Sequence, residues 1–449
     1  MNRVSRRRFL GACGALAALP QARAQQAPAG ASAREIRLEA GPARIAVVGA
    51  PHPDTDLWAY NGAFPGPVLR ARQGETLRAR LVNRLPQETT LHWHGIRLPN
   101  AMDGVPHLTQ KPVAPGGEFL YEFALPDAGT FWYHPHASSP EQLGRGLYGA
   151  LIVEERTPPA FDRDVVWVLS DLRLDREAQV ARDFNAPFDA SHAGRLGNTA
   201  LVNGRVPDAF ALDAGQRVRL RLVNAANARI FRLNFEGHAP RVIALDGHPV
   251  APHALAGGLT LGPGMRADLQ LEASGEPGRR YAVTDDFFPR RAYRVIDLAY
   301  TERRAPARLL PMPQLPPNPL SAPDVARAER HKLVLGGGAM RPRQPEGLWS
   351  INGRSPRGHA HEPLLRLKRG RSYILEVEND TAWHHPFHLH GVAFRTLNES
   401  HQPWRDTALV DPGARAAFAF VADNPGDWMI HCHILEHQES GMMAVMRIE

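Results

Sequence analysis

The stretch Gly426-Asp427-Trp428-Met429-Ile430-His431-Cys432-His433, followed by His437 and Met442, gathers a cysteine, three histidines and a methionine at the end of one apolar run. The run Trp428-Met429-Ile430 predicts a β-strand, in which successive side chains point to opposite faces. His431 and His433 should therefore face one way and Cys432 the other. A cysteine with two histidines and a weak axial methionine is the ligand set of a blue-copper site. We expect Cys432 to bind one metal ion while its two neighbours face a second site.

A unit built in the same way occurs three times along the chain. Each copy has an Asn-Gly turn, then a polar-apolar alternation that ends in asparagine; the turns are Asn61-Gly62, Asn203-Gly204 and Asn352-Gly353, and the strand ends are Asn83, Asn224 and Asn379. Short Val/Ile/Leu/Phe runs separated by Gly, Pro, Asn and Asp fill the rest, which is typical of sandwiches and barrels. The sequence predicts an all-β chain of about three domains, as its length also suggests.

The breaks between copies give the expected boundaries. We place the first domain at 34–156, the second at 160–303 and the third at 327–449, with a linker at 304–326. The linker is rich in proline, which makes such a segment extended and semi-rigid. It should reach across the molecule.

Four His-x-His pairs occupy matching places in the first and third copies: His92/His94, His134/His136, His388/His390 and His431/His433. On a strand, both imidazoles of a pair project to one face. Eight imidazoles exceed the capacity of one ion and suit a cluster of about three ions. Structural zinc would need four ligands in one closed cluster, which this pattern does not resemble. The second copy has no such pair, so we expect the middle domain to be structural.

The blue site needs a second imidazole besides His437. His385 is the best candidate, because Pro386 separates it from the His388/His390 pair. We treat the neighbouring His384 as a non-ligand.

These motifs resemble those of multicopper oxidases, the group that contains laccases, bilirubin oxidase and bacterial cuprous oxidases. The motifs are H-W-H-G from His92, W-Y-H-P-H from Trp132, H-P-F-H-L-H-G from His385, and H-C-H-I-L-E-H from His431 with Met442. The similarity covers the chain from about residue 34 to its end. It implies three cupredoxin-like Greek-key domains.

The resemblance also implies four copper ions and their ligands. Type 1 copper would take His385, Cys432, His437 and Met442. The type 2 ion would take His92 and His388, and the two type 3 ions would take His94, His134, His136, His390, His431 and His433.

The reaction implied is one-electron oxidation of a donor at type 1 copper, electron passage through Cys432, and four-electron reduction of dioxygen to water at the cluster. This reduction consumes protons, and Asp103 and Glu436 resemble the family's proton-relay carboxylates. The alternative is that they are a turn aspartate and an exposed strand-end glutamate. The axial Met442 should give a medium potential, because the axial ligand tunes such a site.

The motifs do not encode the donor. Phenols or aromatic amines are the expected substrates, with Mn(II) or Cu(I) as the alternative. Asp285, Asp286, His401 and Trp404 are candidates for the donor-binding rim by position. A copper nitrite reductase would lack the third domain, and a copper-free scaffold would have lost ligands, so the complete set disfavours both.

The N-terminus predicts export. Residues 5–10, Ser-Arg-Arg-Arg-Phe-Leu, and the Ala22-Arg23-Ala24 site are typical of a twin-arginine signal over residues 1–24. Its apolar run is too short to span a membrane, and the resemblance of the Cys13 region to a lipoprotein box is faint. The mature chain would keep Cys432 as its one cysteine, without a disulfide. We expect a periplasmic monomer.

The net charge of +7 does not predict a nucleic-acid partner. Arginines are scattered, and no basic run interleaved with aromatic residues is present. We expect a solvated basic surface.

Overall fold

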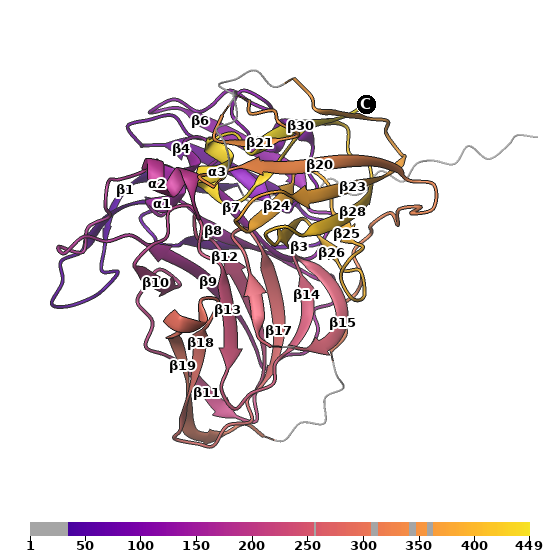
Figure 1. The fold of residues 1–449 in the computed structure, drawn as a ribbon. Coiled ribbons are helices and arrows are strands. Elements are labelled where there is room, and N and C mark those ends of the chain that lie inside the picture. The colour runs from indigo at the N-terminus through magenta and orange to yellow at the C-terminus, as the bar shows by residue number, and fades with distance from the viewer. Residues whose placement is uncertain (1–34, 256, 307–312, 341–346, 357–361) are drawn as a thin grey trace, which may run out of the picture. The chain divides into compact units, whose positions relative to one another are not determined.

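The computed structural model describes residues 35–255, 257–306, 313–340, 347–356 and 362–449. The predicted signal over residues 1–24 and part of the 304–326 linker lie outside them. The described residues form six sheets that pair into three cupredoxin-like domains in chain order, as Figure 1 shows. The all-β prediction with three such domains is confirmed.

The first domain is a sandwich of two four-stranded sheets with orders β2-β1-β4-β6 and β3-β8-β7-β5. Its strands are β1 (Ile36–Ile45), β2 (Thr55–Tyr60), β3 (Gly66–Arg72), β4 (Thr76–Asn83), β5 (His92–His94), β6 (Glu118–Ala124), β7 (Gly129–His134) and β8 (Gly149–Glu154). Strand β4 shows why these segments are strands. Leu77, Ala79 and Leu81 are buried while Arg78 and Arg80 between them are half-buried, which is the period-two pattern of a sheet with one face on the core.

The middle domain pairs a six-stranded sheet, β10-β9-β12-β17-β14-β15, with a five-stranded sheet, β11-β19-β18-β13-β16. Its strands are β9 (Arg163–Leu172), β10 (Thr199–Val202), β11 (Ala209–Ala214), β12 (Arg217–Asn224), β13 (Phe231–Phe235), β14 (Arg241–Leu245), β15 (His248–Ala254), β16 (Leu259–Leu261), β17 (Arg266–Glu272), β18 (Arg280–Asp285) and β19 (Tyr293–Arg304).

The third domain repeats this plan with sheets β21-β20-β23-β28-β25-β26 and β22-β30-β29-β24-β27. Its strands are β20 (Glu329–Gly337), β21 (Trp349–Ile351), β22 (Leu365–Leu367), β23 (Ser372–Asn379), β24 (His385–Leu389), β25 (Phe394–Thr396), β26 (Trp404–Arg405), β27 (Thr407–Val410), β28 (Arg415–Val421), β29 (Gly426–Cys432) and β30 (Met443–Ile448).

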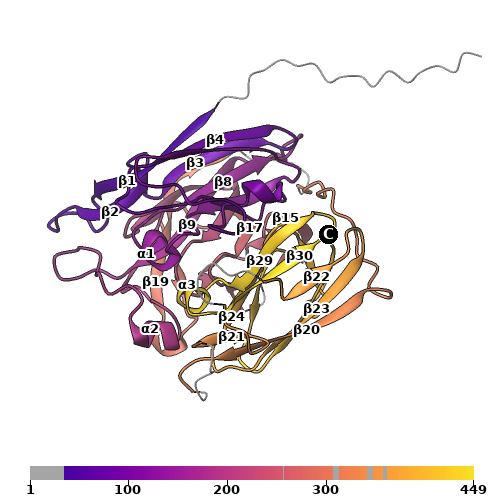
Figure 2. The same cartoon turned by 90° about the horizontal axis from the view of Figure 1, so that it is seen from above.

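Short helices occupy the connections. They are α1 (Ser139–Gly144), α2 (Pro187–Ser191), α3 (Leu435–Glu439), and the 3-10 helices η1 (Asn100–Met102) and η2 (Pro289–Arg291). One α-helix comes from each domain, and α3 contacts both α1 and α2. Figure 2 shows the three together at the side where the first and third domains meet. None of the helices in the described residues is long and apolar enough to cross a membrane.

The first and third domains share one hydrophobic core. Trp93 and Tyr133 of the first domain belong to the same buried cluster as Phe387 and Trp428 of the third. A second cluster fills the middle domain, and a third lies between the first and middle domains. The faces that carry the histidine pairs therefore meet at a buried junction.

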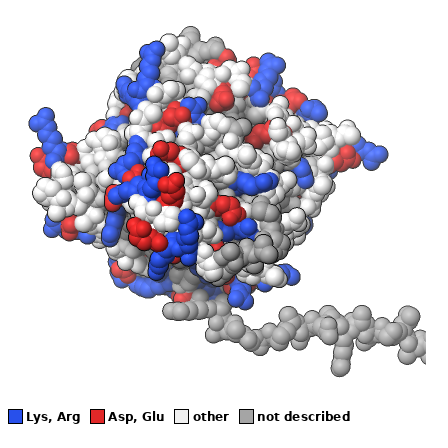
Figure 3. Space-filling model, turned by 90° about the horizontal axis from the view of Figure 1, so that it is seen from below, with Lys and Arg blue, Asp and Glu red and all other residues white. Residues whose placement is uncertain are grey.

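The described part of the proline-rich segment, from residue 313 onward, contacts two domains. Its Asn318 accepts a hydrogen bond from the Ala128 N–H at 2.9 Å and donates to the Gly247 carbonyl at 3.3 Å, and Arg97 donates to the Pro319 carbonyl at 3.3 Å. The segment thus contacts both the first and the middle domains. On the face drawn in Figure 3, basic and acidic side chains are interspersed.

Candidate metal centre

Cys432, His385 and His437 bring three ligand atoms together in the third domain. The Cys432 Sγ lies 3.4 Å from Nδ1 of His385 and 3.6 Å from Nδ1 of His437, and these two nitrogens are 3.2 Å apart. All three side chains, and that of Met442, are fully buried. Main-chain hydrogen bonds from the Met442 N–H to the His437 carbonyl and from the Cys432 N–H to the Met442 carbonyl hold the segment in place.

The outer nitrogen of each imidazole has a partner of its own. Nε2–H of His385 donates to Thr381 Oγ1 at 2.8 Å, and Nε2–H of His437 donates to the His192 carbonyl at 2.6 Å. Burial lowers the pKa of His385 well below its ordinary value and that of His437 to about 3, and it raises the pKa of the Cys432 thiol. The imidazoles are therefore neutral, with Nδ1 lone pairs facing the thiol, and metal binding here would release the thiol proton.

The eight paired histidines form three groups of three imidazoles, with His94 shared by two groups. They are His92/His94/His388, His94/His134/His433 and His136/His390/His431, and within each group the nitrogens lie within 4.8 Å of one another. Strand register brings them together, because His92 pairs with His134 between β5 and β7, and His388 pairs with His431 between β24 and β29. The predicted opposite faces of β29 are confirmed, since His431 meets His390 while Cys432 meets His385.

Most of these rings hold one nitrogen in a hydrogen bond and turn the other inward. Nδ1–H of His92, His134, His388 and His431 donates to a main-chain carbonyl at 2.7–3.0 Å. The inward nitrogens without a partner are Nε2 of His92, His134, His136 and His388, Nδ1 of His94, and both nitrogens of His433. Nε2 of His390 and of His431 face each other at 3.0 Å.

Unpartnered buried nitrogens are costly unless a ligand takes them. Burial and the neighbouring imidazoles also lower the pKa of the group members His94, His134, His136, His388, His390, His431 and His433. Neutral imidazoles with free inward lone pairs are what copper requires. The residues present therefore fit a set of copper ions.

Asp103 joins the two halves of this group. Its Oδ2 accepts from Nδ1 of His390 at 2.8 Å and its Oδ1 lies 3.3 Å from Nδ1 of His92. The next residue, Gly104, has φ +82°, and a Cβ there would lie 2.0 Å from the Leu91 carbonyl oxygen. Only glycine lets the chain pass so close to the β5 segment and place Asp103 beside both domains' histidines.

Glu436, the other predicted relay carboxylate, points toward the middle domain. It is fully buried in α3, and its Oε1 accepts from Asn227 Nδ2 at 3.3 Å. The side chain of α3 that approaches the eight histidines is Gln438, whose Nε2 lies 3.5 Å from Nδ1 of His136. On a strand, residues 436 and 438 would point to the same face. Because this segment is the helix α3, their side chains point in different directions.

Asp406 and Thr407 contact the histidines and were not expected from the sequence. Nε2–H of His94 lies 3.1 Å from both Asp406 Oδ1 and Thr407 Oγ1. Burial alone would raise the pKa of Asp406, but the Arg266 guanidinium holds it well below its usual range. No motif marks this pair, because the contact joins residues more than 300 positions apart.

A cover built from residues of the third and middle domains shields the Cys432 group. Trp349 packs on His437 with ring centroids 4.1 Å apart, and its Nε1–H donates to the Ala190 carbonyl of α2 at 2.6 Å. Outside it, the His192 ring stacks on Phe188 at 4.1 Å and meets Trp383 edge-on at 5.8 Å. Phe188 is 69% exposed.

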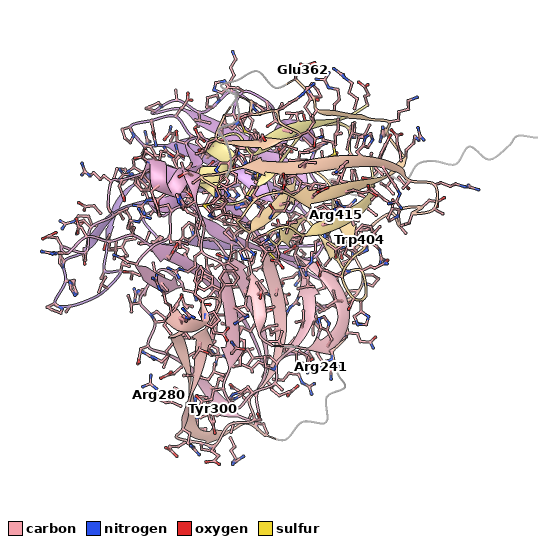
Figure 4. The ribbon with its side chains drawn as sticks, viewed as in Figure 1. Arg241, Arg280, Tyr300, Glu362, Trp404 and Arg415 are labelled. Atoms are coloured by element: carbon pink, nitrogen blue, oxygen red, sulfur yellow. The ribbon has the colours of Figure 1, made fainter. Side chains whose placement is uncertain are left out.

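Two of the four residues predicted for the donor-binding rim, Trp404 and His401, do not lie beside the cover of the Cys432 group. Figure 4 shows Trp404 on β26, away from α2 and α3, and His401 packs near His253 of the middle domain at 6.1 Å. Asp286 pairs with Arg232, and Asp285 is buried.

A cavity of about 490 Å³ reaches the eight-histidine group from the surface. It lies between the first and third domains, and its lining includes Glu88, His107, His136, Met429 and Gln438.

Comparisons with known proteins agree with this geometry. Family models described as multicopper oxidase match residues 44–158, 163–297 and 329–449. The chain is 31% identical to Multicopper oxidase MmcO of Mycobacterium tuberculosis, over 96% of this chain and 90% of that protein. Two solved structures are also similar: the multi-copper oxidase of Pseudomonas thermotolerans (39% identity, TM-score 0.86, 94% of this chain and all of that one) and that of Pseudomonas parafulva (40%, TM-score 0.83, 92% and all).

Fold, ligand geometry and these relationships agree, and the chain belongs to the multicopper oxidase family of copper-dependent, dioxygen-reducing oxidoreductases.

Proposed function

We propose that this multicopper oxidase takes single electrons from small aromatic donors, phenols or aromatic amines, at the covered face of the third domain. The observation that carries the proposal is the cover itself. The side chains of His385, Cys432, His437 and Met442 are fully buried, so a donor must dock on what lies outside them. That outer layer is an exposed phenylalanine stacked on an imidazole, which suits a planar ring.

The groups of inward nitrogens support the following ligand sets. His385, Cys432, His437 and Met442 would hold type 1 copper. His92 and His388 would hold type 2 copper, and the type 3 pair would take the sets His94/His134/His433 and His136/His390/His431. When bound, these ions supply one-electron oxidation of the donor at type 1 and four-electron reduction of dioxygen to water at the cluster.

Cys432 connects the two sites through the chain itself. Its thiol lies between two type 1 imidazoles, and its peptide bonds lead directly to His431 and His433. The His431 Nδ1–H donates to the Cys432 carbonyl at 2.9 Å, which adds a second link. The path from one site to the other is therefore short and rigid.

Asp103 is proposed as the residue that holds a proton for oxygen reduction. Its carboxylate contacts His92 through Oδ1 and His390 through Oδ2, so a proton on its oxygens would be next to both ligand sets. Dioxygen and water would use the cavity that His136 and Gln438 line. Glu436 is proposed as the second proton-relay carboxylate. Its Oε1 accepts a hydrogen bond from Asn227 of the middle domain.

A metal-ion donor is the second candidate, and Met340 favours it. Met340 as a residue is 75% exposed, and the N–H of the adjacent Ala339 donates to the Ser191 carbonyl at the end of α2. A thioether beside the cover is a soft ligand of the kind that selects Cu(I).

Oxygen uptake of the copper-loaded protein with a phenol, Mn(II) and Cu(I) separates these candidates. For Phe188→Ala we expect kcat/KM for the phenol to fall about 2- to 10-fold, the equivalent of one stacking contact. The values of kcat/KM for Mn(II) and Cu(I) should not change. Trp404→Ala removes an aromatic ring on the distant β26 edge and should leave all donors unchanged. Met340→Ala should lower Cu(I) oxidation selectively if the second candidate holds, and equal loss on all donors in Phe188→Ala would contradict the docking face.

We also propose that the chain is exported folded by the twin-arginine route to the periplasm. The Ser5-Arg6-Arg7 segment and the Ala22-Arg23-Ala24 site support this. Replacing both Arg6 and Arg7 by lysine should retain the uncleaved protein in the cytoplasm, and cleaved periplasmic protein from that variant would contradict the proposal.

A further inference from the structure

The middle domain holds no predicted ligand, yet one of its arginines is next to the histidine cluster. Arg266, the first residue of β17, is fully buried. Its guanidinium forms a two-pronged pair with Asp406 of the third domain, with Nη1 to Oδ1 at 2.7 Å and Nη2 to Oδ2 at 2.5 Å. It also donates from Nε to the Thr130 carbonyl of the first domain at 3.1 Å. One side chain thus touches all three domains.

Asp406, held by Arg266, in turn accepts hydrogen bonds from two histidines of the cluster. Its Oδ1 accepts from Nε2–H of His94, in the first domain, at 3.1 Å. Its main-chain carbonyl accepts from Nδ1–H of His388, in the third domain, at 2.9 Å. The Thr407 hydroxyl lies within 3.1 Å of the same two ring nitrogens.

His94 differs from five other histidines of the cluster in which nitrogen it turns inward. His92, His134, His388, His390 and His431 each have Nδ1 in an outer hydrogen bond. In His94 the outer nitrogen is Nε2, and Nδ1 is buried, inward and unpartnered. A neutral imidazole carries one proton, and the hydrogen bond of one nitrogen decides which nitrogen keeps the lone pair.

We propose that Asp406, clamped by Arg266 of the middle domain, is a positioning residue that fixes the tautomer and the orientation of His94 and so keeps its Nδ1 available to a metal ion. The middle domain then forms part of the frame of the histidine cluster. This proposal rests on the proposed ligand sets, because it assigns His94 Nδ1 as a ligand atom.

A purely structural role is the competing explanation, and the same strand supplies a matched control. Asp268, two residues after Arg266 on β17, pairs with Arg219 at 2.7 and 2.9 Å, and both side chains are 1% exposed. Its other partners are Thr130 and Arg221. It is an equally buried aspartate–arginine pair whose partners are not cluster histidines.

Asp406→Asn keeps the size of the side chain but removes the carboxylate that accepts hydrogen bonds from both Arg266 and His94. Oδ1 and Oδ2 both accept from the guanidinium, so an amide NH2 at either place would face an arginine donor. The remaining oxygen cannot hold Arg266 and His94 as the carboxylate does. Arg266→Lys keeps the charge and removes the two-pronged clamp.

The test measures copper per chain, the blue absorption band, the near-ultraviolet shoulder and the type 2 EPR signal of copper-loaded full-length proteins. We expect Asp406→Asn to weaken copper retention at the cluster about 10- to 100-fold, as loss of a ligand's hydrogen-bond partner does, with the shoulder reduced relative to the blue band. Arg266→Lys should give a smaller reduction. Asp268→Asn should lower the thermal midpoint and keep the ratio of shoulder to band.

The proposal is overturned if Asp406→Asn keeps the wild-type ratio and type 2 signal, or if Asp268→Asn loses the shoulder equally. If Asp406→Asn does not fold, Arg266→Lys decides. An unchanged ratio in it, or loss of both bands together, also overturns the proposal. Wild-type protein without the shoulder would contradict the ligand sets themselves, which is a different failure.

Discussion

The two candidate copper centres differ in how many domains build them. The Cys432 group takes all its side chains from the third domain, from β24, β29, α3 and Met442 just before β30. The eight-histidine group takes four from the first domain and four from the third. The ligands of the first centre come from one domain, whereas those of the second come together only when two domains are docked.

The junction between the first and third domains is therefore the structural basis of the second centre. Besides the shared core, Asn100 donates to the Asp427 carbonyl at 2.7 Å and Asn424 donates to the Leu98 carbonyl at 3.0 Å. Asp103 links His92 and His390 across the same junction. Changes in the third domain should affect the blue centre, and changes at the junction should affect the cluster.

The largest expected effect breaks the local centre alone. Cys432→Ser should abolish the blue band and donor oxidation, because a hydroxyl cannot replace a thiolate as the soft ligand. The type 2 EPR signal should persist, since His431 and His433 keep their places on the strand. Absorption and EPR spectra of the copper-loaded variant check this, and a blue Cys432→Ser protein would refute the assignment.

Asp103→Asn should break the shared centre's chemistry and leave the local centre working. An amide cannot hold or release a proton as the carboxyl does, so oxygen consumption should fall about 100-fold, as expected for loss of a general acid. Stopped-flow reduction of the blue band by donor without oxygen should stay at the wild-type rate. A loss of that reduction step as well would show that Asp103 acts on both centres.

Acid should weaken the contact between the middle domain and the proline-rich segment through His248 of β15. Its Nδ1 accepts from Asn318 Nδ2 at 3.1 Å, and burial lowers its pKa to about 4. The unfolded value is about 6.5, so between these values the unfolded chain binds the proton more tightly and stability falls as the pH falls. Above pH 6.5 the free energy of unfolding does not depend on this group. At pH 5 the free energy of unfolding is lower by about 2 kcal/mol.

The check is the urea midpoint of copper-loaded protein from neutral pH down to pH 4. His248→Gln keeps an acceptor for Asn318 and should make this acid dependence shallower. An acid dependence identical to that of wild type would exclude His248 as a contributor.

The smallest effect is Asn100→Ala, which removes one hydrogen bond across the junction. We expect a loss of about 1 kcal/mol, seen as an earlier loss of the near-ultraviolet shoulder in a urea titration. The blue band should disappear at the wild-type concentration. If both bands shift together, the two centres unfold as one unit, and the junction is not a separate weak point.

The sequence predicted the features that depend on local pattern. Strand alternation places His431 and His433 opposite Cys432, and the repeat relates His92/His94 to His388/His390, so these two features are enough to predict how the ligands group. The fold followed from the three repeats and their turns.

Contacts between distant residues could not be predicted in this way. The His192 carbonyl on His437 and the Asp406 carboxylate on His94 join different domains without a motif. The direction of Glu436 depends on the short helix α3, which replaces the strand that its neighbours indicate. The middle domain was expected to be structural, and two of its segments lie at the centres: α2 residues cover one, and Arg266 contacts Asp406 beside the other.

In the proposed function, donor oxidation at one centre is coupled to full reduction of dioxygen at the other. The most direct measurement is the ratio of donor oxidised to dioxygen consumed by the copper-loaded protein, with hydrogen peroxide measured in the same reaction. We predict four one-electron oxidations for each dioxygen and no free peroxide. A ratio of two with peroxide released, or donor oxidation without oxygen uptake, would contradict the coupled two-centre account.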